Sequence, residues 1–120
     1  MKVTALALDP IEKKPLARYK PGSMILSVGG LGCTMRCPWC QNHTIAQPED
    51  PALVSVREMS VDELVEEARA LVGEGNIGLA YTYNEPLVRW REVAECARVI
   101  HEAGLDNVLV TNGLIAADKL

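Results

Sequence analysis

Three cysteines lie within eight residues of one another in the first third of the chain. Cys33, Cys37 and Cys40 have the spacing C-x3-C-x2-C, and three glycines lie just before the first of them. Thiolates are soft ligands, so three of them on a glycine-flanked loop can surround one compact iron–sulfur cluster. A [4Fe–4S] cluster usually takes four cysteines, and three leave one iron open to an outside ligand. The spacing therefore predicts a metal site that can carry out chemistry as well as transfer electrons.

Two other interpretations of these cysteines stay open. One is structural zinc, with His43 at C-x2-H spacing from Cys40 as the fourth ligand. Zinc sites usually pair two short C-x2-4-C knuckles, whereas this segment holds one such pair. The other interpretation is burial of the three cysteines as small hydrophobic residues. The fourth cysteine, Cys96, lies in an apolar-flanked helical segment, and we expect it to pack in the core.

The net charge and the hydropathy pattern argue against some classes of protein. The net charge is −4, with six Lys or Arg against two Asp or Glu in residues 1–40 and six against fourteen in residues 41–120. A chain this acidic is a poor general nucleic-acid binder, and no apolar run approaches the roughly 20 residues of a membrane span. The first nine residues lack the features of a signal peptide. We therefore expect a cytoplasmic protein without disulfides that binds neither nucleic acid nor membrane.

The hydrophobic pattern predicts the elements that position the cysteines. Residues 1–23 carry three prolines between positions 9 and 23, and we expect them to form an irregular lead-in. From there strands and helices alternate. Strands are expected at 24–28, 77–83 and 107–110, and helices at 60–72, from Pro86 to about residue 100, and again from about Leu114. Ser60 and Glu63 form a capping box at the start of the first of these helices.

Alternation of this kind predicts an α/β fold with parallel βα repeats. Ligands of such folds collect at the carboxyl ends of the strands. The cysteine loop follows the first predicted strand, Asn84-Glu85-Pro86 follows the second, and Thr111-Asn112-Gly113 follows the third. These three segments should therefore lie at one edge of the sheet. Because the last predicted helix has only begun at residue 120, we expect residues 24–120 to be the first half of a larger barrel.

The segment Gly32–Asn42 resembles the signature of radical S-adenosylmethionine (SAM) enzymes of the pyruvate formate-lyase activating type. In those enzymes an aromatic residue precedes the third cysteine, as Trp39 does here. Residues 9–16, 19–23 and 81–86 are similar to one subgroup, the AmmeMemoRadiSam-system radical SAM enzymes. The resemblance covers nearly the whole chain. It implies that residues 24–120 form the N-terminal half of a radical SAM core domain, a partial (β/α)6 TIM-like barrel.

The resemblance also implies a reaction and its cofactors. SAM would chelate the open iron of the [4Fe–4S] cluster through its amino and carboxylate groups. One electron through the cluster would cleave SAM to methionine and a 5′-deoxyadenosyl radical, which abstracts hydrogen from a substrate. The implied partners are an electron donor such as flavodoxin or ferredoxin, and a substrate that is either a glycyl residue of another protein or a small molecule.

Three further residues are assigned to SAM by the resemblance. Trp39 would lie near the adenine, or else pack within the loop. Glu85 stands where relatives carry the glutamate of a Gly-Gly-Glu motif, and its carboxylate could accept a hydrogen bond from the SAM amino group. Here Tyr83 and Asn84 replace the two glycines, and Glu85 could instead favour the start of the following helix. Asn112 could contact the methionine part of SAM or form a plain Asn-Gly turn.

Overall fold

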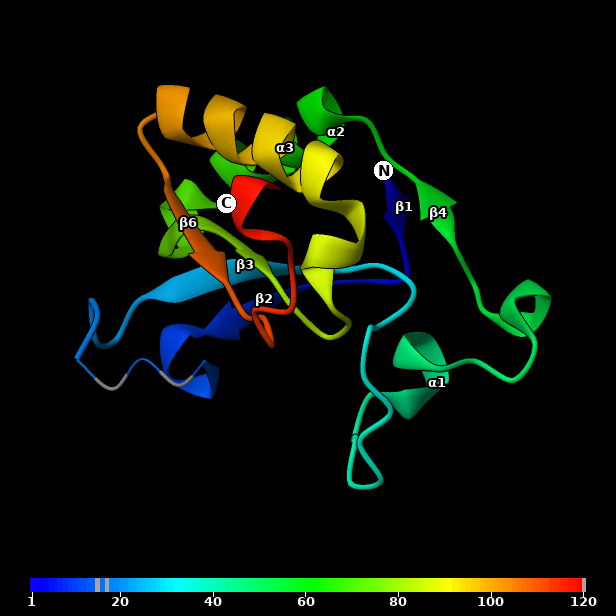
Figure 1. The fold of residues 1–120 in the computed structure, drawn as a ribbon. Coiled ribbons are helices and arrows are strands. Elements are labelled where there is room, and N and C mark those ends of the chain that lie inside the picture. The colour runs from blue at the N-terminus through cyan, green and yellow to red at the C-terminus, as the bar shows by residue number, and fades with distance from the viewer. Residues whose placement is uncertain (15, 17, 120) are drawn as a thin grey trace.

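The computed structural model describes residues 1–14, 16 and 18–119, which form a four-stranded sheet with the two longest helices on one face and a separate two-stranded sheet (Figure 1). The strands are β1 (Lys2–Val3), β2 (Ala5–Pro10), β3 (Met24–Gly29), β4 (Arg57–Glu58), β5 (Asn76–Tyr81) and β6 (Asp106–Leu109). The α-helices are α1 (His43–Ala46), α2 (Val61–Ala70) and α3 (Trp90–Glu102). Short 3-10 helices are η1 (Ile11–Lys13), η2 (Pro51–Leu53), η3 (Val72–Glu74), η4 (Pro86–Arg89) and η5 (Ala117–Lys119). The alternation of strands and helices expected after residue 24 is confirmed as far as β6.

Three parallel strands form the part of the sheet that matters for the site. The four-stranded sheet has the order β2-β3-β5-β6, in which β3, β5 and β6 are parallel and β2 runs antiparallel to β3. Strands β5 and β6 approach each other closely at Gly78, where an added Cβ would lie 1.9 Å from the Asp106 carbonyl oxygen. A glycine is required there because any side chain would collide with the neighbouring backbone. The result is a mixed α/β fold with parallel strands.

The expectation of an irregular lead-in over residues 1–23 is wrong for its first half. Residues 5–10 form β2, which pairs with the whole of β3 from Ala5↔Gly29 to Pro10↔Met24. The alternating pattern Ala5-Leu6-Ala7-Leu8 explains the strand, because Leu6 and Leu8 both pack against the main core. Pro10 is tolerated since β2 is an edge strand of this sheet and the proline is its last residue.

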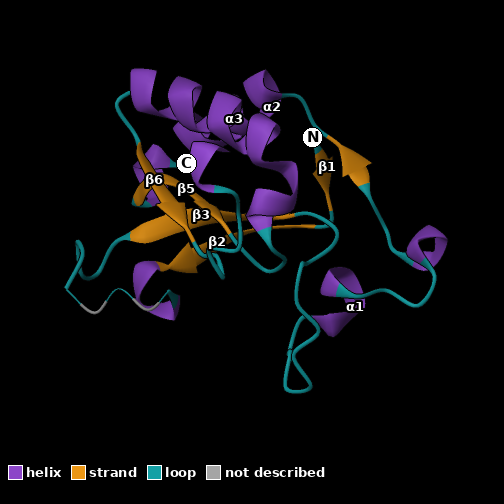
Figure 2. Cartoon of the chain, in the orientation of Figure 1, coloured by secondary structure: helices purple, strands orange, loops and turns teal. Residues whose placement is uncertain are grey.

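Helices α2 and α3 lie side by side on one face of the sheet and bury the main core there (Figures 1 and 2). Helix α2 begins with the expected capping box, in which Ser60 Oγ accepts from the Glu63 amide and the Glu63 carboxylate accepts from the Ser60 amide. The core contains residues from the helices and from alternate strand positions: Leu26, Val28, Leu64, Val65, Ala68, Leu79, Tyr81, Val93, Cys96 and Ile100. Burial of Cys96 in this core is as expected.

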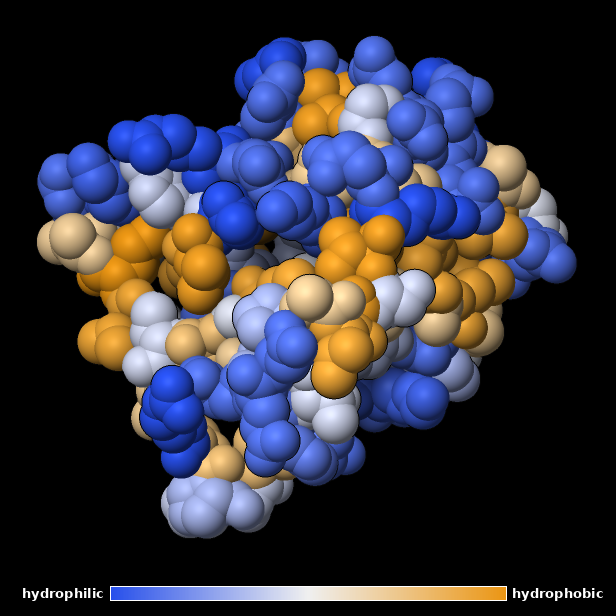
Figure 3. Space-filling model, turned by 90° about the vertical axis from the view of Figure 1, so that its right-hand side faces the viewer, coloured by the Kyte–Doolittle hydropathy of each residue, from blue (hydrophilic) through white to orange (hydrophobic). Residues whose placement is uncertain are grey.

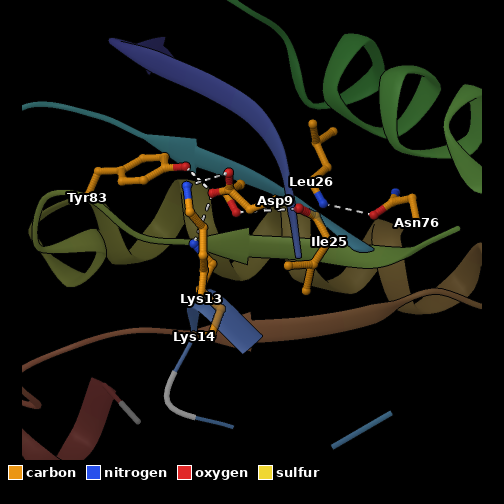
Figure 4. A network of polar contacts seen from close by, with 8 residues as sticks. Asp9, Lys13, Lys14, Ile25, Leu26, Asn76 and Tyr83 are labelled. Atoms are coloured by element: carbon orange, nitrogen blue, oxygen red, sulfur yellow. Dashed lines mark hydrogen bonds and ion pairs between the residues drawn. The ribbon is translucent and has the colours of Figure 1, made fainter. Parts of the chain in front are cut away.

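A buried asparagine joins the sheet to α2. Asn76 is 3% exposed, and its side-chain oxygen accepts a hydrogen bond from the Leu26 amide at 2.8 Å (Figure 4). Its side-chain nitrogen donates to the Ala68 carbonyl oxygen at 2.9 Å, in the last turns of α2. The contact to Leu26 lies where the pairing of β3 with β5 shifts register between Met24 and Leu26. Asn76 thus satisfies backbone groups that the irregular ladder leaves free.

The chain after β6 differs from the expectation of a helix from about Leu114. Residues 110–116 form no helix, and only the short turn η5 follows them. The Asn112 side chain accepts a hydrogen bond from the Leu114 amide at 2.8 Å, and Gly113 has φ of 73°. Such a local side-chain bond competes with helix formation, which explains the difference. Among the described residues, no helix is long and apolar enough to cross a membrane.

Candidate functional site

The cysteine loop begins at the carboxyl end of β3 and extends away from the sheet before it reaches α1 (Figures 1 and 2). Cys33, Cys37 and Cys40 are free thiols, and all three are partly exposed. The alternative of three buried hydrophobic cysteines is therefore wrong for this structure. The Cys40 amide donates to the Cys37 carbonyl oxygen at 3.1 Å, so the second and third cysteines flank one tight turn.

Two contacts from the α1 segment hold the first part of this loop. The Gln47 side-chain amide donates to the carbonyl oxygens of Cys33 at 3.0 Å and Met35 at 2.7 Å. The Gly32 amide donates to the Ile45 carbonyl oxygen at 2.9 Å. Sequence reasoning did not identify Gln47, because its role depends on α1 folding back on the loop. The loop thus has an ordered base at Cys33.

The three cysteine side chains are donors of the kind that a soft-metal cluster takes. Three free thiols on one accessible loop are the ligands that iron–sulfur clusters take. Within the described part of the chain, however, no group of three His, Cys, Asp or Glu side chains is close enough to hold one metal ion. The same finding applies to the zinc alternative with His43. Cluster binding by Cys33, Cys37 and Cys40 therefore stays a prediction.

Glu85 lies at the carboxyl end of β5 and connects that end to the neighbouring strand. It is 3% exposed, and its carboxylate accepts hydrogen bonds from the Thr111 hydroxyl and from the Asn112 amide at 2.9 Å. It also accepts from the Leu87 amide at 3.2 Å, so Glu85 is the N-cap of η4. The helix-start role considered for Glu85 is confirmed. A carboxylate offers about four acceptor positions, so one position remains for a further donor.

Asn112 joins the Glu85 end of the sheet to the cysteine loop. Its side-chain nitrogen lies 3.0 Å from Thr34 Oγ1 and 3.8 Å from Cys33 Sγ. The Asn-Gly turn is also present, since the Asn112 oxygen accepts from the Leu114 amide. The Asn-Gly turn considered for Asn112 is therefore present, and its contact with the methionine part of SAM stays a prediction. Cys33, Glu85 and Asn112 are brought together at one edge of the sheet, as expected from the parallel topology.

Asn84 fastens the start of the cysteine loop and was not identified as a site residue from the sequence. Its side-chain oxygen accepts from the Gly30 amide at 2.9 Å, and its side-chain nitrogen donates to the Gly32 carbonyl oxygen at 3.0 Å. The Glu85 amide donates to the same Gly32 oxygen at 3.1 Å. The sequence does hold a signal for Asn84, because it belongs to Tyr83-Asn84-Glu85, the segment compared above with a Gly-Gly-Glu motif. A glycine there could make none of these side-chain contacts.

Trp39 lies on the cysteine loop and is not among the residues that meet at the sheet edge, Cys33, Glu85 and Asn112. Its side chain is 82% exposed, so it does not pack within the loop. It stands between Cys37 and Cys40 on the outer part of the loop, where a flat apolar ligand could reach it. The structure leaves its contact with adenine as a prediction.

Comparison with known proteins agrees with the cysteine motif and the parallel strands. The sequence profile of the radical SAM superfamily matches residues 27–120, which begin within β3 and include all three motif cysteines. "Uncharacterized protein MJ0808" of Methanocaldococcus jannaschii is 41% identical over 120 residues, which cover 99% of this chain and 34% of that protein. The chain thus spans about a third of the length of this curated relative. Since the profile covers well over half of the chain, the chain belongs to the radical SAM superfamily.

Proposed function

We propose that this chain is the N-terminal part of a radical SAM enzyme, in which Cys33, Cys37 and Cys40 hold a [4Fe–4S] cluster. The observation that carries the proposal is the convergence of the C-x3-C-x2-C loop with Glu85 and Asn112 at the carboxyl ends of β3, β5 and β6. The match to the superfamily over residues 27–120 supports it. When bound, such a cluster supplies one electron that cleaves SAM to methionine and a 5′-deoxyadenosyl radical, which takes hydrogen from a substrate.

The residues of this chain would bind and orient SAM beside the cluster. The Glu85 carboxylate would accept a hydrogen bond from the SAM ammonium group, because it is already held rigidly by Thr111 and Asn112 and has an acceptor position left. The exposed Asn112 amide would contact the methionine carboxylate. Trp39, exposed on the loop, would stack on the adenine.

Partners and substrate belong to the same proposal. One electron per turnover calls for a small redox protein such as flavodoxin or ferredoxin. The resemblance to pyruvate formate-lyase activating enzymes supports a glycyl residue of a partner protein as one substrate class. The replacement of the two glycines by Tyr83 and Asn84 separates the chain from those enzymes, so a small molecule is the other class to test.

Anaerobic reconstitution of the full-length protein tests the proposal. We expect iron and sulfide to bind in a four-to-four ratio, with the broad visible absorbance of an iron–sulfur protein. We also expect 5′-deoxyadenosine when SAM and a strong reductant are added. A colourless protein that binds one zinc ion and forms no 5′-deoxyadenosine would instead identify a zinc-binding interaction module.

A further inference from the structure

A second polar cluster lies on the sheet face opposite α2 and α3, away from the cysteine loop. The Tyr83 hydroxyl donates a hydrogen bond to Asp9, and the Lys14 ammonium group lies 3.4 Å from the same carboxylate (Figure 4). Lys14 also lies 5.0 Å from the centre of the Tyr83 ring. Asp9 is 7% exposed and Lys14 is 6% exposed. The three groups therefore form a network, buried at Asp9 and Lys14 and half-buried at Tyr83, between the N-terminal segment and the loop after β5.

The Tyr83 phenol and the Asp9 carboxyl differ in ionisation at neutral pH. Burial and the hydrogen bond to Asp9 raise the pKa of Tyr83 to about 12, so the phenol stays a neutral donor. Burial by itself would raise the pKa of Asp9, but the Tyr83 hydrogen bond and the Lys14 charge outweigh it and leave the pKa below its ordinary value. Asp9 is thus an anion that accepts from Tyr83 at neutral pH. A hydrogen bond to an ionised carboxylate is stronger than one between neutral groups, so it holds the Tyr83 side chain in place.

The backbone of Tyr83 needs such an anchor. Tyr83 has φ of 72°, in the left-handed region that non-glycine residues rarely adopt. Its side chain lies directly over Gly29, where an added Cβ would come 2.9 Å from the Tyr83 Cβ and Cδ2 atoms. Glycine at position 29 leaves the space into which the tyrosine packs. Strained residues of this kind persist where surrounding contacts determine them.

The residues that follow Tyr83 are those that hold the site. Asn84 bonds to Gly30 and Gly32 at the start of the cysteine loop, and Glu85 bonds to Asn112 beside Cys33. The direction in which Asn84 and Glu85 leave β5 depends on the backbone turn at Tyr83. An unbroken series of contacts therefore runs from Asp9 and Lys14 through Tyr83 to the cysteine loop.

We infer that Tyr83 is a positioning residue for the SAM site: anchored by Asp9 and Lys14, it fixes the turn that aims Asn84 and Glu85. The inference deepens the proposed function and rests on it for the part that concerns SAM. It also explains the departure from Gly-Gly-Glu in physical terms. At a left-handed backbone position that glycine adopts without strain, this chain has a tyrosine whose side chain is bonded to Asp9.

The test compares Tyr83→Phe with Tyr81→Phe in the full-length protein. Both changes delete one phenol hydroxyl that donates a hydrogen bond. The Tyr81 hydroxyl donates to Asn107 Oδ1 at 3.0 Å, on the helix-covered side of the sheet, so Tyr81→Phe is the matched control. Hydrogen exchange before reconstitution gives a readout that needs no cofactor. Tyr83→Phe should speed exchange at the amides of Gly30 and Glu85 at least about tenfold, because one charge-assisted hydrogen bond no longer holds the turn. Tyr81→Phe should leave these two amides unchanged.

The second readout is SAM affinity after reconstitution. Tyr83→Phe should weaken SAM binding at least about tenfold with iron content unchanged, whereas Tyr81→Phe should not. Equal exchange rates and equal SAM affinities in the two variants would overturn the inference. Faster exchange in Tyr83→Phe with unchanged SAM affinity would overturn it as well. A wild-type protein that binds iron but no SAM would contradict the proposed function instead. Exchange at Gly30 and Glu85 would then still decide whether Tyr83 holds the turn.

Discussion

At the scale of single residues, the sequence identifies the candidate ligands of the cluster and of SAM. It does not identify the residues that hold these ligands in place. The three cysteines stand out as candidate ligands because their spacing indicates a soft-metal cluster, and their binding of a cluster stays a prediction. Glu85 and Asn112 were predictable because residues at the carboxyl ends of parallel strands share one edge. Gln47 was not, since its bonds to the carbonyl oxygens of Cys33 and Met35 depend on the path of the chain after the loop.

Glu85→Gln tests the proposed role of the carboxylate. The change keeps the shape of the side chain and removes its charge, so the bond to the SAM ammonium group loses its charge assistance. Such a bond is worth about 1.5–3 kcal/mol, and SAM binding should therefore weaken roughly 10- to 150-fold. The measurement is SAM affinity of the reconstituted full-length protein.

Iron content is the control for Glu85→Gln, because no cysteine is altered. We expect wild-type iron loading in the variant. Unchanged SAM affinity would leave Glu85 with only its observed role as the N-cap of η4. Loss of iron would show that the carboxylate supports the loop structure rather than SAM.

At the scale of secondary-structure elements, the hydrophobic pattern predicted where strands and helices occur and less well where they end. Helix α2 and its capping box were predictable from Ser60 and Glu63 because capping is local. Strand β2 was missed because the prolines after residue 9 suggested irregular structure, whereas pairing with β3 decides the outcome. The left-handed backbone of Tyr83 has no local signal, since tertiary contacts to Asp9 and Gly29 impose it.

The contact between Asp9 of β2 and Tyr83 in the loop after β5 should make the free energy of unfolding depend on pH. Asp9→Asn should lower the free energy of unfolding by about 2–4 kcal/mol at pH 7, because Lys14 stays buried without its anion. The Asp9 pKa is depressed in the folded protein, so its stabilising effect is present above the ordinary pKa of about 3.9 and is lost as the pH falls through the lower folded value.

Urea unfolding of wild type and Asp9→Asn over a pH series checks this expectation. The difference between the two proteins should be constant from pH 7 down to about 5 and should shrink only at more acidic pH, below the ordinary carboxyl pKa. A gap that stays constant into strong acid would mean that the charge of Asp9 does not stabilise the fold. Absence of any gap at pH 7 would show that the network contributes nothing to stability.

At the scale of the whole molecule, the four-stranded sheet is covered by α2 and α3 on one face, and among the described residues both of its edge strands, β2 and β6, pair on one side only. In the part of the chain that the structure describes, the face opposite the helices has a small core around Ile11, Ile25 and Ala80. Several large hydrophobic side chains are also exposed, among them Leu53, Val72 and Leu114, and Figure 3 shows hydrophobic patches separated by hydrophilic residues on one side of the molecule. We propose that further βα units of a partial TIM-like barrel complete this sheet in the full-length protein.

A fragment of residues 1–120 should therefore associate with itself. Unpaired strand edges and open sheet faces favour pairing with another chain. We expect oligomers or aggregates in size-exclusion chromatography, whereas a longer protein that includes the following segment should elute as a defined species. A monodisperse fragment with cooperative unfolding would count against the barrel proposal.

The measurement that tests the central claim most directly compares Cys37→Ala with Cys96→Ala in the full-length protein. Both remove one thiol, but Cys37 belongs to the proposed cluster ligands and Cys96 is buried in the core. After anaerobic reconstitution, Cys37→Ala should lack a stable [4Fe–4S] cluster and form no 5′-deoxyadenosine from SAM. Cys96→Ala should retain both and lose only about 1 kcal/mol of stability. Full iron loading and 5′-deoxyadenosine formation by Cys37→Ala would contradict the account.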